Sequence, residues 1–173
     1  MRFLVASDSH GRVSSLFSML ERAHTPRFPA DGVIFLGDGL RDLEYLRDMG
    51  LTLFSVSGNC DIYTMGAPRQ DLLTFEGYRI LFTHGDGFSV KAGEERLAAY
   101  AAGKGADIVL YGHTHIPSEH YYREGDTVGE LVLEKPLYAL NPGSVGEHRG
   151  GNAPGFGVLE LSARGVTWSR VTL

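Results

Sequence analysis

The first half of the chain alternates short continuous apolar runs with segments of helical spacing. The runs at residues 3–6 and 33–36 are typical of strands buried on both faces, and residues 51–56 predict a third strand. Between the first two, a helix is predicted to begin at a Ser14 cap, with apolar residues at helical spacing. Those apolar positions are Leu16, Phe17, Leu20 and Ala23. The resulting β-α-β order predicts a parallel sheet with right-handed crossovers.

A second helix is predicted between the second and third runs, with an apolar residue at every third position over residues 40–49 and an end at Gly50. Farther along, residues 72–75 and 79–82 predict a hairpin, residues 94–102 a helix, and residues 107–111 another short strand. The remaining predicted strands cover residues 119–123, 129–133, 137–140, 157–161 and 166–171. The sequence therefore predicts a mixed α/β fold in which two facing sheets have helices outside, with residues 1–173 forming a single domain.

Composition narrows the function classes. The chain has 173 residues and a formal net charge of −5. It has no run of basic residues that could bind the nucleic-acid backbone over a broad surface. Its single cysteine excludes a disulfide framework within the chain. No apolar run approaches the ~20 residues that span a bilayer, and the first run is too short for a signal peptide. We therefore expect a cytoplasmic protein without a membrane or a stable nucleic-acid partner.

Polar side chains follow five of the predicted strands, each in a loop that also contains glycine. These side chains are Asp8, His10, Asp38, Asn59, His84, His113 and His115. Because ligands of open α/β sheets bind beyond the carboxyl ends of the strands, we expect the five loops to meet along one sheet edge. Taken singly, each motif has an ordinary explanation as a turn, a helix cap or a core histidine. Their combination in this order favours one shared site.

The donors in these loops are carboxylate, amide and imidazole groups, which suit Mn²⁺, Fe²⁺, Ni²⁺ or Zn²⁺ better than an all-oxygen calcium site. Seven donors are too many for one tetrahedral ion and fit two ions about 3.5–4 Å apart. Asp38 is alone in its loop, and its two oxygens make it the natural bridge between the ions.

The motifs Asp8-Ser9-His10, Gly37-Asp38, Gly58-Asn59, a lone His84 and Gly112-His113-Thr114-His115 resemble the signature of the calcineurin-like metallophosphoesterase superfamily. The size and an Asn-Pro-Gly-Ser element at residues 141–144, expected to support the site wall, resemble its YfcE-like phosphodiesterase branch. The resemblance implies a four-layer α-β-β-α sandwich. It assigns one ion to Asp8, His10, Asp38 and His115, and the other ion to Asp38, Asn59, His84 and His113.

The resemblance also implies a reaction, hydrolysis of a small phosphodiester through a metal-activated bridging hydroxide, with two Mn²⁺ ions expected and Ni²⁺, Fe²⁺ or Zn²⁺ as alternatives. His10, Asn59 and His113 are the candidates for a direct part in catalysis, and the general acid stays unassigned. Many superfamily members have a histidine where this chain has Cys60. Because a thiol is the weaker hydrogen-bond donor, this difference argues against efficient monoester hydrolysis. Cys60 either contacts the substrate or is a buried thiol with a structural role.

Several alternatives remain open at this point. Arg12 is a candidate phosphate contact, and the loop with His148 and Arg149 is either solvated or in contact with phosphate. A retromer subunit shares this fold and acts as a scaffold, so a non-catalytic scaffold is the alternative function, followed by a phosphomonoesterase or a nuclease. Edge strands in the C-terminal half make a homodimer possible. Substrate choice depends on loops at residues 62–71 and 145–155.

Overall fold

A computed structural model describes residues 1–62 and 66–173, so part of the loop at 62–71 lies outside the described residues. The first sheet has the order β12-β11-β1-β2-β3. Its parallel strands are β1 (Arg2–Ala6), β2 (Gly32–Phe35) and β3 (Thr52–Ser55), and its antiparallel strands are β11 (Gly155–Ser162) and β12 (Gly165–Thr172). The three predicted apolar runs therefore form the parallel part of this sheet.

The second sheet has the order β4-β5-β6-β10-β7. Its strands are β4 (Gln70–Phe75), β5 (Tyr78–Thr83), β6 (Ile108–Leu110), β10 (Leu137–Asn141) and β7 (Ser118–Tyr122). Here β5, β6 and β10 run parallel, whereas β4 and β7 pair antiparallel at the two edges. The hairpin between β4 and β5 turns at Glu76 and Gly77, whose φ angles of 50° and 87° match the twist of a two-residue turn.

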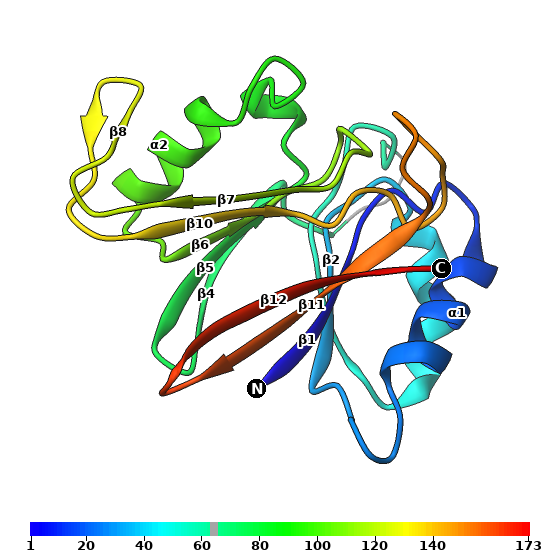
Figure 1. Ribbon diagram of the computed structural model, residues 1–173. Coiled ribbons are helices and arrows are strands. Elements are labelled where there is room, and N and C mark those ends of the chain that lie inside the picture. The colour runs from blue at the N-terminus through cyan, green and yellow to red at the C-terminus, as the bar shows by residue number, and fades with distance from the viewer. Residues whose placement is uncertain (63–65) are drawn as a thin grey trace.

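The two sheets face each other, and each carries helices on its outer side (Figure 1). One apolar cluster lies between the sheets and includes Phe3, Ile34, Phe82 and Leu159. Two further clusters bury the helices, α1 (Val13–Ala23) and the 3₁₀ helix η1 (Leu40–Met49) on the first sheet, and α2 (Glu95–Gly103) on the second. The predicted four-layer α-β-β-α arrangement is confirmed.

Helix α1 begins at Val13, so the prediction that Ser14 caps it is wrong. Arg12 occupies the cap position, and among the described residues no side chain caps this end. The buried face is Leu16, Met19, Leu20 and Ala23. Phe17, predicted to face the core, is 38% exposed, because the spacing from Leu16 to Leu20 turns it to the flank of the helix.

The second predicted helix has 3₁₀ geometry, in keeping with its apolar repeat of three residues, and it ends where Gly50 adopts a φ of 72°. The short 3₁₀ turn η2 (Asp86–Phe88) follows β5. The predicted strand at 129–133 is shorter than expected, because only β9 (Leu131–Val132) forms within it. Gly129, with a φ of 62°, turns the chain between β8 (Thr127–Val128) and β9 (Leu131–Val132), which pair only with each other. None of the described helices combines the length and apolar character needed to cross a bilayer.

Candidate active site

The donor-bearing loops meet where the carboxyl ends of both sheets come together. The loops after β1, β2 and β3 carry Asp8 with His10, then Asp38, then Asn59, whereas the loops after β5 and β6 carry His84, His113 and His115. The expectation of one sheet edge was therefore wrong. Two parallel strand sets, one in each sheet, point their carboxyl ends at the same place, because the sheets pack face to face with their ends aligned.

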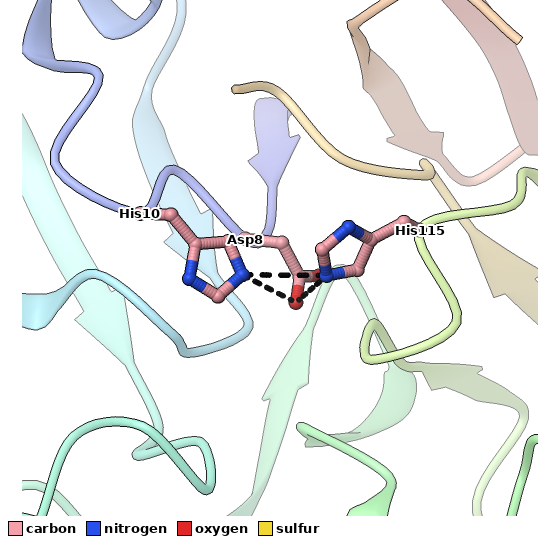
Figure 2. Close-up of side chains that lie close together, drawn as sticks. All are labelled: Asp8, His10 and His115. Carbon is pink, nitrogen blue, oxygen red and sulfur yellow. Dashed lines mark hydrogen bonds and ion pairs between the residues drawn. The ribbon is translucent and has the colours of Figure 1, made fainter. Parts of the chain in front are cut away.

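Asp8, His10 and His115 form the first donor group (Figure 2). Nε2 of His10 lies 3.3 Å from Nε2 of His115, and Asp8 Oδ1 lies 3.1 Å from the His115 nitrogen and 3.8 Å from the His10 nitrogen. The Asp8 side chain is fully buried. Glu147 Oε2 lies 3.2 Å from the other ring nitrogen of His115, but the contact lacks hydrogen-bond geometry, so this buried nitrogen has no hydrogen-bond partner among the described residues.

Asp38, His84 and His113 form the second donor group. His84 Nε2 lies 3.3 Å from Asp38 Oδ2 and 3.1 Å from His113 Nδ1. The other ring nitrogen of His84 is 2.8 Å from the carbonyl oxygen of Leu36, to which it donates in the neutral ring. This hydrogen bond leaves the lone pair of Nε2 directed at the site.

Asp38 lies between the two groups. Its Oδ2 is 3.3 Å from His84 Nε2 and 4.0 Å from His10 Nε2, while its Oδ1 accepts a hydrogen bond from the Cys60 backbone N–H. Burial would raise the pKa of Asp38, but the hydrogen bonds from His84 and Cys60 hold it well below its ordinary value. The Asp38 carboxylate is therefore ionised and positioned to serve both groups, as a bridging ligand must be.

The polar atoms of the site are arranged to bind divalent cations and not to hydrogen-bond with one another. Asp8 Oδ1 is buried without a hydrogen-bond partner among the described residues. In each group two imidazole nitrogens face each other at close range, which leaves two lone pairs in contact unless a proton or a cation lies between them. Buried carboxylate oxygens and facing imidazoles are what a pair of metal ions would satisfy.

Five of the seven predicted donors adopt left-handed backbone conformations. The φ angles are 57° for Asp8, 46° for His10, 58° for Asp38, 66° for His113 and 59° for His115. Residues with a side chain rarely adopt this conformation, and such strain persists where the surrounding structure imposes it. The strained backbone turns the side chain of each donor back over the end of its strand.

Two glycines allow these loops to approach one another. A Cβ atom at Gly58 would lie 2.0 Å from Asp38 Oδ1, and one at Gly112 would lie 1.9 Å from Ser7 Oγ. Neither glycine has a positive φ, so both positions need glycine for space and not for conformation. The Gly-Asn and Gly-His motifs therefore include glycine because a carboxylate-bearing loop packs directly against each.

Two buried carboxylates hold the donor loops, and the sequence analysis assigned neither of them a role. Asp61 accepts hydrogen bonds from the backbone N–H groups of Asp38, Gly39, Leu40 and Gly58 at 2.7–3.0 Å. Asp42 accepts a hydrogen bond from the Ser9 hydroxyl and another from the Gly11 N–H. Asp61, three residues after Gly58, was recognisable only as a turn residue, and Asp42 lies within a predicted helix.

The Asn-Pro-Gly-Ser element supports the wall of the site, as expected. Ser144 Oγ donates to the Asp8 carbonyl oxygen at 2.7 Å and accepts from the N–H of Glu147 at 2.8 Å. Asn141 Nδ2 donates to the Gly112 carbonyl oxygen at 3.0 Å. The segment after β10 therefore connects the first donor loop of one sheet to the last donor loop of the other.

The remaining predicted residues lie at the rim. Asn59 is exposed, and its Nδ2 contacts Cys60 Sγ at 3.2 Å, so its ligand role stays a prediction. Cys60 is exposed, which overturns the alternative of a buried structural thiol. Its sulfur belongs to a third possible donor group with His10 and Asp38. Partial desolvation and the Asp38 carboxylate raise the pKa of the Cys60 thiol to about 11. Arg12 is exposed at the start of α1.

Residues 1–164 match the family model described as a calcineurin-like phosphoesterase superfamily domain. The chain belongs to the calcineurin-like phosphoesterase superfamily. Phosphodiesterase YfcE of Escherichia coli is 30% identical to it, over 92% of this chain and 88% of YfcE. The probable metallophosphoesterase YsnB of Bacillus subtilis is 31% identical, over 96% of this chain and 88% of YsnB.

A solved structure of Vps29 from Entamoeba histolytica, in complex with zinc, superimposes with a TM-score of 0.70 at 25% identity, over 99% of this chain and 98% of Vps29. Membership in the calcineurin-like superfamily supports phosphoesterase activity and the binding of divalent metal ions. Asp8, His10 and His115 lie together, and Asp38 lies with His84 and His113, whereas the resemblance also assigned Asp38 to the first ion. The assignment of ligands to two ions, including the role of Asn59, stays a prediction.

Proposed function

We propose that the chain hydrolyses phosphodiesters at a centre that holds two divalent ions, one at each donor group. The observation that carries this proposal is the position of Asp38, whose Oδ2 lies within reach of imidazoles from both groups. Bound there, the ions supply Lewis-acid activation of water and neutralise charge on the phosphate. The donor set of carboxylates and imidazoles supports Mn²⁺ as the working ion, with Ni²⁺, Fe²⁺ and Zn²⁺ as alternatives.

The chain's own groups provide orientation and charge. The Leu36 carbonyl oxygen orients His84, and the low pKa of Asp38 keeps its carboxylate ionised at neutral pH. Cys60, exposed beside Asp38, presents a protonated thiol at neutral pH where an imidazolium would otherwise assist a poor leaving group. This supports diesters with good leaving groups as the preferred substrates.

The test measures metal content and hydrolysis together. We expect His84→Ala and Asp38→Ala to lose bound Mn²⁺ and the hydrolysis of bis(p-nitrophenyl) phosphate in parallel. His24→Ala is the matched control, because the His24 ring bonds to the Ala30 N–H away from the site and should leave both readouts unchanged. Full activity of chelated wild-type protein would refute the proposal.

A second measurement addresses the choice between diesters and monoesters. Cys60→His introduces an imidazole at the rim of the site, and we expect it to raise p-nitrophenyl phosphate turnover relative to diester turnover. An unchanged ratio would show that Cys60 does not govern this choice.

A non-catalytic scaffold is the second candidate function, because Vps29 has the same fold. A scaffold has no need of a complete donor set, whereas here all seven predicted positions carry donors. Protein that binds metal stoichiometrically but hydrolyses no phosphoester in a panel of monoesters, diesters and cyclic nucleotides would favour the scaffold.

A further inference from the structure

A cleft of about 790 Å³ opens beside the donor groups, between the segment that precedes α2 and the loop after β6. Its lining includes Val90, Ala92, Glu94, Tyr111, Ile116 and Arg149. Tyr111 and Thr114, which also lines the cleft, lie on either side of His113, and Ile116 directly follows His115. One wall of the cleft is therefore the same loop that carries two of the predicted metal ligands.

A buried hydrogen-bond network holds the inner wall in place. The Glu94 carboxylate, whose side chain is 13% exposed, accepts hydrogen bonds from the hydroxyls of Tyr111 and Tyr122, the latter at 3.2 Å. Ser118 Oγ lies 3.4 Å and His120 Nδ1 3.0 Å from the same carboxylate. Since groups from β7 and from Tyr111, which follows β6, already occupy its oxygens, Glu94 shapes the cleft and is not free to bind a cation.

The accessible surface of the cleft is mainly apolar. Ala92 is exposed and Ile116 is 45% exposed, so these two side chains contribute carbon surface, whereas Val90 and Tyr111 are almost fully buried in the wall. Two exposed cations, Lys91 and Arg149, stand at the rim. An apolar recess of this volume with a few polar groups is typical of sites for small organic molecules.

A phosphodiester carries two organic groups, and the donor groups bind only its phosphate. At least one organic group must therefore extend away from the ions. A recess of about 250 Å³ lies directly at His10, Asp38 and Cys60, whereas the larger cleft shares the loop after β6 with His113 and His115.

We propose that this cleft binds the larger organic group of the phosphodiester substrate, a largely apolar group of about nucleoside size. This inference rests on the proposed diester hydrolysis. It identifies the cleft as the part of the protein that distinguishes one diester from another. It makes Ala92 and Ile116 specificity-determining residues, neither of which touches the donor groups.

The test compares two diesters that release the same leaving group. Methyl p-nitrophenyl phosphate has a small second group, and thymidine 5′-monophosphate p-nitrophenyl ester has a nucleoside. Ala92→Trp fills the cleft from an exposed position, so we expect the KM of the thymidine ester to rise about tenfold while that of the methyl ester is unchanged. Ile116→Ser, which removes apolar wall surface, should raise the same KM by a smaller factor.

The matched control is Ala163→Trp, at the exposed turn between β11 and β12, which should change neither KM. Calorimetric titration with thymidine 5′-monophosphate gives a readout independent of turnover, in which Ala92→Trp should bind more weakly than the control. Equal effects of Ala92→Trp on both diesters, or none on the thymidine ester, would overturn this inference. Failure of the wild type to hydrolyse either diester would instead refute the proposed function.

Discussion

The strongest prediction concerns Asp61, which touches none of the donor imidazoles in the contacts described above. Its two oxygens accept four backbone hydrogen bonds, two at each oxygen, and they join the loop after β2 to the loop after β3. Asp61→Asn keeps the size and shape of the side chain but replaces one acceptor oxygen with an NH₂ donor. Whichever way the amide is oriented, two backbone N–H groups then face a donor.

The magnitude follows from these contacts. A hydrogen bond to a charged group contributes about 1.5–3 kcal/mol, so losing two of them should cost about 3–6 kcal/mol of the free energy of unfolding. For a chain of this length, that loss corresponds to a fall in Tm of about 6–24 °C. Because Asp38 belongs to the loop after β2, which these hydrogen bonds hold in place, we also expect Mn²⁺ affinity to fall at least tenfold.

The assay is urea unfolding of metal-free protein, followed by calorimetric titration with Mn²⁺. Asp126→Asn is the control, because the Asp126 carboxylate accepts a hydrogen bond from the Arg123 N–H in an exposed turn and its loss should cost less than about 1 kcal/mol. If Asp61→Asn unfolds within about 1 kcal/mol of the wild type and binds Mn²⁺ normally, the four hydrogen bonds do not position the site.

Three further predictions test the site and its surroundings. Gly58→Ala would place a methyl group 2.0 Å from Asp38 Oδ1, so calorimetry should show weaker Mn²⁺ binding, whereas Gly87→Ala, whose methyl group meets nothing within 4 Å, should bind normally. Mn²⁺ at a hundred times its Kd should raise the free energy of unfolding by about 2.7 kcal/mol. A thermal unfolding scan in which Mn²⁺ does not raise the Tm, or in which EDTA does not reverse the rise, would contradict metal binding. Burial and Glu94 raise the pKa of Tyr111 above 10.0, so stability should fall as pH rises above about 10, and less steeply in Tyr111→Phe. If the free energy of urea unfolding depends on pH equally in the wild type and in Tyr111→Phe between pH 8 and 11, this prediction is refuted.

Much of the fold could be predicted from the sequence because the apolar pattern is local. The runs at 3–6 and 33–36 became β1 and β2 within a residue, because a strand buried on both faces needs a continuous apolar run. Residues 51–56 contain β3, which is only partly buried. Helix ends and short turns were less predictable. The Ser14 cap was wrong and the start of the strand at 129–133 was misplaced, because caps and turns depend on backbone angles and on partners distant in sequence.

The sequence by itself determined which side chains gather, since each donor directly follows an apolar strand and parallel strands end together. It could not determine that the donors come from two sheets, because that depends on how the sheets pack. Only the tertiary structure decided the distances that place Asp38 between the two groups, the four hydrogen bonds to Asp61 and the cleft beside the loop that carries His113. Each of these depends on distances between segments far apart in the chain, which no local pattern encodes.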